Sequence, residues 1–347
     1  MARERLISIM ESIFYQSLGC DKKFYDEALK SITNKKRGFS LGGYVDSMVI
    51  LSHVLDDHPE LFYVSQEFKK KYSFLGKEIQ FKYIYTSSDE KQIRSELERV
   101  AHELLGNLVN AHQSEYDKIR NMHDYLKNNL QYDMNAVGNS CLSNRHIAES
   151  HTIVGALLNH KCVCEGFAKA MKYLCDKVGI ECWVVSGKGS SSVATGSHSW
   201  NIVKINGCYH HVDVTWDNQY AETSNTPNYG YLNLSDDEIA KDHTWERKYY
   251  PACPISPYNY FRVNDALIDS KNQLEKFLYN SFQMEEECIM FRVVRGSALE
   301  GVVQGCLQDS IQNAIHRCKH IDMRQWRYSQ IPEQLTFYIH PQYIYCD

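Results

Sequence analysis

Residues 198–216 read HSWNIVKINGCYHHVDVTW, and this stretch decides the fold of the middle of the chain. On both sides of Asn206-Gly207 it is rich in β-branched and aromatic residues, which are typical of strands. The Asn-Gly dipeptide is the strongest short signal for a two-residue hairpin turn. A turn of that length pairs Ile205 with Cys208 and so sets the register of the whole hairpin.

The register of this hairpin brings a histidine and an aspartate together. Counting back from the turn pairs Trp200 with Asp213, which makes His198 and Asp213 diagonal neighbours on one face. Diagonal side chains in a sheet lie about 7 Å apart or less, within reach of an imidazole and a carboxylate. An ordinary core or surface histidine is the alternative for His198. We interpret His210 and His211 as ordinary strand residues.

A cysteine lies at the start of a predicted helix further upstream. Residues 160–179 read HKCVCEGFAKAMKYLCDKVG, with one apolar stripe along the helix and Gly179 where a left-handed C-cap belongs. Cys164 then lies in the first turn, where unpaired N–H groups and the helix dipole stabilise a thiolate. Gly166 is expected to leave space beside the sulfur for a substrate. The alternative is that Cys164 is one more buried thiol.

The order Cys164, His198, Asp213 supplies a nucleophile, a base and an orienting carboxylate, the set that covalent catalysis requires. A zinc site built from Cys162, Cys164, His198 and one of His210 or His211 is the other interpretation. It is disfavoured because Cys-x-Cys is poor ligand spacing for a tetrahedral site. We therefore expect neither a metal nor another cofactor.

Composition limits the partners and the compartment. The 347 residues are 43% hydrophobic and 23% charged, with a formal net charge of −5 and no basic block, so nucleic acid is not an expected partner. The longest apolar run, residues 48–55, is far short of the roughly 20 residues that cross a bilayer, so no membrane association is expected. Residues 1–18 are typical of an amphipathic helix and not of a signal peptide, which predicts a cytoplasmic protein. In that compartment the twelve cysteines, none in a CxxC pair, are expected to be mostly buried thiols.

The regions before the hairpin mix helices and strands. Helical patterning runs through residues 6–14 and 48–55, and residues 78–85 alternate as a half-buried strand does. Asp89 is the expected cap of the next helix, and Ser114 begins another with a variant capping box. The Gly/Ser-rich run of residues 186–197 is expected to be a mobile loop beside the site.

Three prolines, Pro251, Pro254 and Pro257, mark a linker toward the C-terminus. Beyond it we expect a strand at residues 288–294, a helix carrying Leu307 and Ile311, and a strand at 334–340. The predicted organisation is an N-terminal α+β region (1–110), a core (111–250) and a C-terminal α/β domain (258–347) whose role the sequence leaves open.

Three segments resemble the core motifs of the transglutaminase-like superfamily, in its bacterial branch of cysteine proteases. They are residues 163–168 (VCEGFA), 198–203 (HSWNIV) and 211–217 (HVDVTWD). The resemblance extends over about residues 45–245. It implies an α+β fold with a papain-like core, in which a nucleophile-bearing helix packs on an antiparallel sheet, with additional α/β flanking regions.

The same resemblance assigns Cys164 as nucleophile, His198 as its base and Asp213 as the orienting carboxylate. Gly166, Trp200 and Trp216 belong to these motifs and are candidates for substrate binding or support of the site. The expected reaction is attack on the amide carbonyl of a protein or peptide, with a thioester on Cys164 that is hydrolysed by water. Transfer to an amine, as in protein-glutamine cross-linking, and a non-catalytic peptide-binding scaffold are the alternatives. The oligomeric state stays open.

Overall fold

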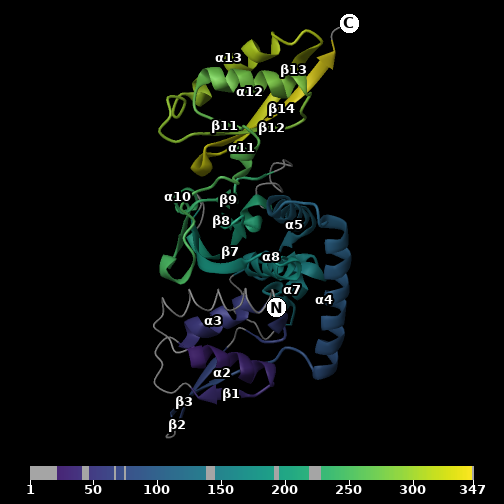
Figure 1. Cartoon of the computed structure of the whole chain (residues 1–347), viewed down its shortest axis with the longest axis vertical. Helices are drawn as coiled ribbons and strands as arrows, with labels where there is room; N and C mark the ends of the chain where they lie inside the picture. Colours follow the sequence, from purple (N-terminus) through teal and green to yellow (C-terminus); the bar gives the residue numbers. More distant parts are fainter. Residues whose placement is uncertain are drawn as a thin grey trace.

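The computed structural model describes residues 22–40, 47–65, 68–73, 76–137, 145–190, 195–218 and 228–345. Their elements form three tiers along the long axis of the molecule, with the N-terminal region at one end and the C-terminal unit at the other (Figure 1). Among these residues, no helix is both long and apolar enough to cross a membrane. The amphipathic helix predicted near the N-terminus lies outside the described residues.

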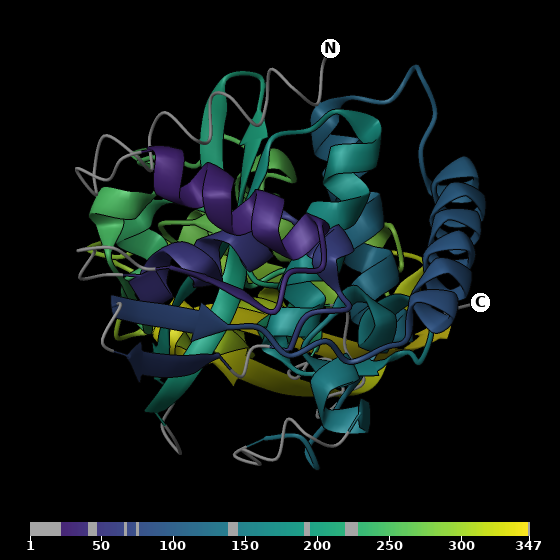
Figure 2. The same ribbon diagram turned by 90° about the horizontal axis from the view of Figure 1, so that it is seen from below.

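The N-terminal tier combines helices with a small antiparallel sheet of strand order β1-β3-β2. The long helix α4 stands along one side of the molecule (Figures 1 and 2). The elements of this tier are α2 (Lys22–Thr33), β1 (Gly38–Ser40), α3 (Ser47–Asp57), η1 (Pro59–Leu61), β2 (Lys69–Ser73), β3 (Gly76–Gln80) and α4 (Ser87–Leu108).

Two predictions in this tier were wrong in detail. The strand expected at residues 78–85 ends at Gln80, and beyond it Tyr83 forms only an isolated bridge with Val64. The alternating aromatic residues after Gln80 pack into the core without strand partners. Helix α4 is capped by Thr86, whose side chain accepts a hydrogen bond from the Asp89 amide at 3.2 Å, so Asp89 lies in the first turn.

The middle tier is a five-stranded antiparallel sheet of order β10-β6-β7-β8-β9, with α8 packed on β6 and β7. Apolar side chains are buried on both faces: Val203 and Ile205 belong to the core shared with α8, whereas Trp200 and Ile202 belong to a second, aromatic cluster. The elements of this tier are α5 (Glu115–Asn129), β4 (Gln131–Tyr132), α6 (Arg145–Ser150), α7 (Ile153–Leu157), β5 (Lys161–Cys162), α8 (Cys164–Val178), β6 (Cys182–Ser190), β7 (Thr195–Ile205), β8 (Cys208–Val212), β9 (Leu232–Leu234), α10 (Asp236–Ile239), β10 (His243–Trp245) and η2 (Arg247–Tyr249).

The predicted hairpin register is confirmed, because Ile205 pairs with Cys208 across a turn in which Asn206 and Gly207 have φ of 47° and 87°. Both values are positive, as a two-residue hairpin turn of this type requires. The second strand is shorter than predicted: β8 ends at Val212, and residues 214–218 are helical. Asp213 lies between the two and binds the next turn through its side chain, so it is a capping residue and not a strand residue.

The Gly/Ser-rich run is largely strand, which corrects the prediction of a loop. Strands β6 and β7 pair as far as Ser190 opposite Thr195. Only residues 191–194 of the run lie outside the described residues.

The C-terminal unit has its own apolar core between residues 261 and 339. Its sheet has the order β11-β12-β14-β13, with β11 and β12 parallel and the other pairs antiparallel. The predicted strand, helix and strand correspond to β12, α13 and β14. The elements are α11 (Tyr260–Val263), β11 (Leu267–Ile268), α12 (Lys271–Gln283), β12 (Ile289–Val293), α13 (Val303–Ile315), β13 (Ile321–Ile331), η3 (Pro332–Gln334) and β14 (Thr336–Tyr345).

Candidate active site

Cys164 is the first residue of α8, with Val163 as the N-cap and no side chain capping the helix. The helix ends at Gly179, whose φ of 75° is the left-handed C-cap that its position predicts. The Cys164 side chain is partly exposed and lies close enough to His198 and to the hydroxyl of Tyr132 in β4 to interact electrostatically with both. A thiol at this end of a helix faces N–H groups that have no partner within the helix.

His198 lies between the thiol and a buried carboxylate. Its Nε2 atom is 2.6 Å from Oδ2 of Asp213, which leaves Nδ1 for the sulfur of Cys164. Burial disfavours a charged ring here. Asp213 and, after it, Cys164 outweigh that effect and raise the pKa of His198 to about 10. The structure therefore brings Cys164, His198 and Asp213 together in the order that the sequence predicted.

Asp213 is completely buried and accepts hydrogen bonds on both carboxylate oxygens. Its Oδ1 accepts the Trp216 amide at 3.1 Å, and Oδ2 accepts Nε2 of His243 at 3.0 Å in addition to His198. Burial alone favours the neutral acid, but His198 and then His243 hold the pKa of Asp213 far below its ordinary value. Asp213 is thus a charged acceptor shared by two imidazole rings.

His243, in β10, was not predicted from the sequence. Its second ring nitrogen, Nδ1, lies 2.6 Å from Oδ1 of Asp242. The Asp242 carboxylate also accepts the Tyr231 hydroxyl at 2.8 Å and the side-chain amide of Gln334 at 3.0 Å. No local motif reveals this arrangement, because β10 joins the sheet through β6 and not through the strand next to it in sequence.

Trp200 and Trp216 pack around the two histidines. The ring of Trp200 stacks on His198 with centroids 5.9 Å apart, and the ring of Trp216 lies 4.3 Å from that of His243. Trp200 is 1% exposed and Trp216 is 9% exposed. Of the two roles predicted for these residues, the packing favours support of the site over contact with substrate.

Two glycines in β6 make room for these indole rings. A Cβ atom on Gly187 would lie 2.7 Å from the Trp200 ring, and one on Gly189 would lie 2.8 Å from the Trp216 ring. Any larger side chain would displace an indole. The glycines of the Gly/Ser-rich run therefore shape the aromatic wall of the site.

Gly166 does not leave an open space beside the sulfur, contrary to the prediction. A Cβ atom there would lie 2.5 Å from Cβ of Cys162 and 2.7 Å from the carbonyl oxygen of Ser150. Gly166 is buried and allows the first turn of α8 to pack on those two residues.

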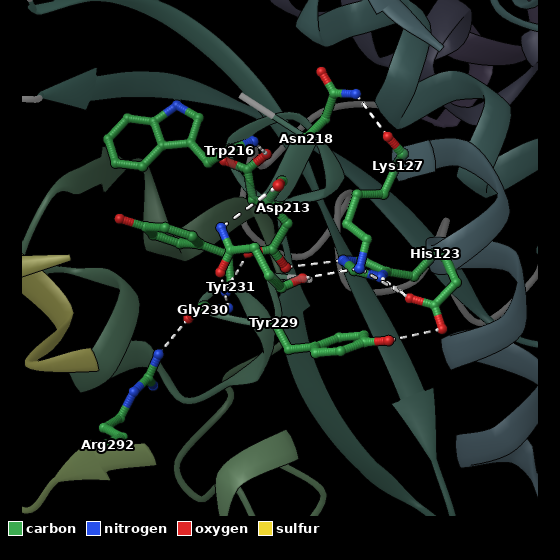
Figure 3. Close-up of polar contacts among 12 residues, drawn as sticks. His123, Lys127, Asp213, Trp216, Asn218, Tyr229, Gly230, Tyr231 and Arg292 are labelled. Carbon is green, nitrogen blue, oxygen red and sulfur yellow. Dashed lines mark hydrogen bonds and ion pairs between the residues drawn. The ribbon is translucent and has the colours of Figure 1, made fainter. Parts of the chain in front are cut away.

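A second buried network supports the turn that follows Asp213. His123 in α5 binds Asp217 at 2.9 Å, and Asp217 also accepts the backbone amide of Tyr231 at 3.0 Å. Figure 3 shows this cluster together with Arg292, a residue of the C-terminal sheet. The guanidinium of Arg292 donates a hydrogen bond to the carbonyl oxygen of Gly230. The turn that follows Asp213 is therefore held by α5 and by the backbone at Tyr231, and Arg292 binds the residue next to Tyr231.

Two groups of three metal-ligating side chains occur among the described residues. The first is His198, Asp213 and His243, whose contacts are the hydrogen bonds already described. The second is His211, Asp236 and Cys253. There the Trp200 indole donates to Nδ1 of His211 at 2.9 Å, so in the neutral ring Nε2 carries hydrogen toward Asp236 and presents no lone pair to a metal.

The zinc site considered from the sequence does not assemble, because neither group includes Cys162 or Cys164. No disulfide joins the nine described cysteines, of which five are buried. His210 and His211 lie in β8, as predicted.

The family model for the transglutaminase-like superfamily matches residues 102–214. Kyphoscoliosis peptidase of Mus musculus is 23% identical over 152 residues, which are 42% of this chain and 22% of that protein. The Homo sapiens protein is 23% identical over 129 residues, 35% of this chain and 19% of that protein. The chain thus spans about a fifth of the length of these relatives.

A solved structure of a TGase aligns over 55% of this chain and 50% of that chain, with 18% identity and a TM-score of 0.30. The family match covers the three motifs up to Val214, and the helix, hairpin and buried Asp213 within it have the arrangement that the motifs imply. Residues 102–214 of this chain therefore match a domain of the transglutaminase-like superfamily.

Proposed function

We propose that this chain is a cysteine-dependent enzyme that cleaves an amide bond of a protein or peptide through a thioester on Cys164. The observation that carries the proposal is one line of contacts. Cys164 at a helix N-terminus meets His198, and the far nitrogen of His198 binds the buried carboxylate of Asp213 at 2.6 Å. This geometry is that of a nucleophile, its base and the group that orients the base.

In the first half-reaction the Cys164 sulfur attacks the amide carbonyl carbon and His198 holds the thiol proton. The C–N bond then breaks, and His198 gives that proton to the leaving amine. A thioester remains on Cys164. Asp213 keeps the ring oriented and stabilises its positive charge throughout, without taking the proton itself.

Negative charge develops on the carbonyl oxygen during the attack and needs hydrogen-bond donors. The backbone N–H of Cys164 is one candidate, since the first N–H groups of a helix have no partner inside it. The hydroxyl of Tyr132 is the second candidate, because it contacts the sulfur. Burial, and secondarily Cys164, raises the pKa of Tyr132, so the hydroxyl keeps its proton as a donor requires.

In the second half-reaction an acceptor attacks the thioester carbonyl carbon while His198 takes its proton, the C–S bond then breaks, and His198 returns the proton to the sulfur of Cys164. Water gives a carboxylic acid, and an amine gives a new amide. We propose water as the acceptor. The peptidase named among the relatives supports hydrolysis at the level of the family.

The test is turnover of peptide-amide substrates by the wild type, Cys164→Ala and Cys208→Ala, with and without a primary amine. Cys208 is a partly exposed cysteine away from the site and serves as the matched control. We expect acid release by the wild type and Cys208→Ala and none by Cys164→Ala. The Ala variant should lose about 1 kcal/mol or less of stability, because little volume is removed. Amide formation with the amine in place of acid would favour transfer, and turnover by Cys164→Ala would refute the proposal. Failure of the wild type to turn over any of the substrates would favour a peptide-binding scaffold.

A further inference from the structure

The orientation of His198 depends on a carboxylate that has a second imidazole partner. Oδ2 of Asp213 lies 2.6 Å from Nε2 of His198 and 3.0 Å from Nε2 of His243. Asp213 and His243 are completely buried, and His198 is 8% exposed. Oδ1 of Asp213 is already bound by the Trp216 amide, and a second donor on Oδ2 further restricts rotation of the carboxylate. The contact with His243 therefore limits how far the base can turn away from the sulfur.

His243 is fixed from its other side by a second carboxylate. Nδ1 of His243 lies 2.6 Å from Asp242, so each ring nitrogen faces a carboxylate oxygen. An ionised carboxylate only accepts hydrogen bonds, so the ring nitrogen that faces Asp213 must carry hydrogen in order to bind it. The titratable groups that face this ring are Asp213, Asp242, His198, His211 and Tyr231.

We propose that His243 is a positioning residue of the catalytic site. Its Nε2–H donates a hydrogen bond to Asp213 and holds this carboxylate in place, and Asp213 in turn keeps His198 oriented toward Cys164. This inference rests on the proposed function and adds a fourth residue to it. The hydrogen bond with the Asp242 carboxylate orients the His243 ring, and hydrogen bonds from Tyr231 and Gln334 orient Asp242. His243 does not touch the reacting atoms, so its effect acts through Asp213.

Two substitutions separate the two sides of the ring. In His243→Gln the amide nitrogen takes the place of Nε2 and keeps a donor for Asp213. In His243→Asn the amide nitrogen takes the place of Nδ1, so this variant keeps the hydrogen bond with Asp242 and loses the hydrogen bond with Asp213. Each variant buries one amide and loses one ring and one hydrogen bond, so a merely structural role predicts equal effects. The contrast between the two variants isolates the contact with Asp213.

The readout is the second-order rate of Cys164 alkylation by iodoacetamide between pH 5 and 8, with a thermal melt of each variant. We expect His243→Gln to stay within about threefold of the wild type and His243→Asn to react at least about tenfold more slowly, at similar melting temperatures. Tenfold is a small part of the roughly 10²- to 10⁴-fold that a general base contributes. Equal rates for the two variants would overturn the proposal for His243 alone. A wild type in which Cys164 is unreactive would overturn the proposed function as well.

The imidazole resonances of the wild type give a test that does not depend on the folding of any variant. A ¹⁵N–¹H correlation spectrum at neutral pH reports which ring nitrogen of His243 carries hydrogen. Hydrogen on Nε2 supports the proposal. A ring protonated at Nδ1 alone has no donor for Asp213 and would overturn it.

Discussion

Asp213 is a charged group in a fully buried position, and this is possible because three donors surround it. Two imidazole nitrogens and the Trp216 amide bind its oxygens at 2.6, 3.0 and 3.1 Å. Desolvation of a carboxylate without such partners costs several kcal/mol, and the group would become neutral instead. The same donors fix the direction in which Asp213 presents Oδ2 to His198.

Replacing this carboxylate by an amide tests its role directly. Asp213→Asn keeps the size of the side chain but offers one acceptor oxygen where the wild type offers two, so the wrong tautomer of His198 is favoured. We expect amide turnover to fall by up to about four orders of magnitude while Cys164 remains present and the protein remains folded. Turnover and far-ultraviolet circular dichroism measure the two effects. Turnover within a few fold of the wild type would exclude Asp213 as the orienting residue.

The high pKa of His198 also predicts how stability depends on pH. Because the folded state raises this pKa from 6.5 to about 10, the folded protein binds more protons than the unfolded chain between those values. The stabilisation by the charged ring is complete below about pH 6.5 and is lost as pH rises toward 10. The free energy of urea unfolding should therefore differ most between the wild type and His198→Gln at pH 6 and least at pH 10. A difference that grows with pH would contradict the contact between His198 and Asp213.

At the scale of elements, α8 is positioned by close packing of its first turn. Gly166 lies against Cys162 and Ser150 with no room for a Cβ atom, whereas Gly106 in α4 has nothing within 4 Å of its Cβ position. These two helical glycines are a matched pair for the same substitution. The neighbours of Gly166 require a glycine, whereas those of Gly106 do not.

We expect Gly166→Ala to destabilise the protein by about 1–3 kcal/mol, the usual effect of overpacking a rigid site. Gly106→Ala should stabilise it by about 0.5–1 kcal/mol, because alanine restricts the unfolded chain and favours the helix. Urea unfolding of both variants measures the difference. Equal effects of the two substitutions would contradict the packing of α8.

The sequence predicts best those elements that local rules determine. The Asn206-Gly207 turn determines the pairing of Ile205 with Cys208, and that register places His198 near Asp213. Sequence patterns do not reveal His243, because its approach to Asp213 depends on the pairing of β10 with β6. They also fail at Gly166, since nothing local indicates which side chain fills the space beside a glycine.

At the scale of the whole molecule, a few buried polar contacts connect the C-terminal unit to the site. Gln334 donates to Asp242 at 3.0 Å, and Arg292 donates to the carbonyl of Gly230 (Figure 3). Gln334 and Arg292 are buried, although the unit has a separate apolar core. Gln334 thus connects the C-terminal unit to Asp242, the carboxylate that binds His243.

Loss of one of these contacts should therefore change the reactivity of a thiol in another tier. A hydrogen bond contributes about 0.5–1.5 kcal/mol, which corresponds to about two- to tenfold in rate if its loss is felt at Cys164. We expect Gln334→Ala to slow alkylation of Cys164 by that factor. Gln304→Ala is the matched control, because Gln304 is an exposed glutamine of the same unit that binds Gln330. Equal alkylation rates for the two variants would contradict an influence of the C-terminal unit on the reactivity of Cys164.

The most direct test of the central claim is the order in which the cysteines react. Burial raises the pKa of the thiols of Cys162, Cys253 and Cys288, whereas Cys164 is partly exposed at a helix N-terminus beside His198. Brief treatment with limiting iodoacetamide near neutral pH, followed by mass-spectrometric mapping, ranks all twelve cysteines of the chain. We predict that Cys164 is labelled first and that His198→Ala removes this preference. Faster labelling of any other cysteine in the wild type would contradict the assignment of Cys164 as the nucleophile.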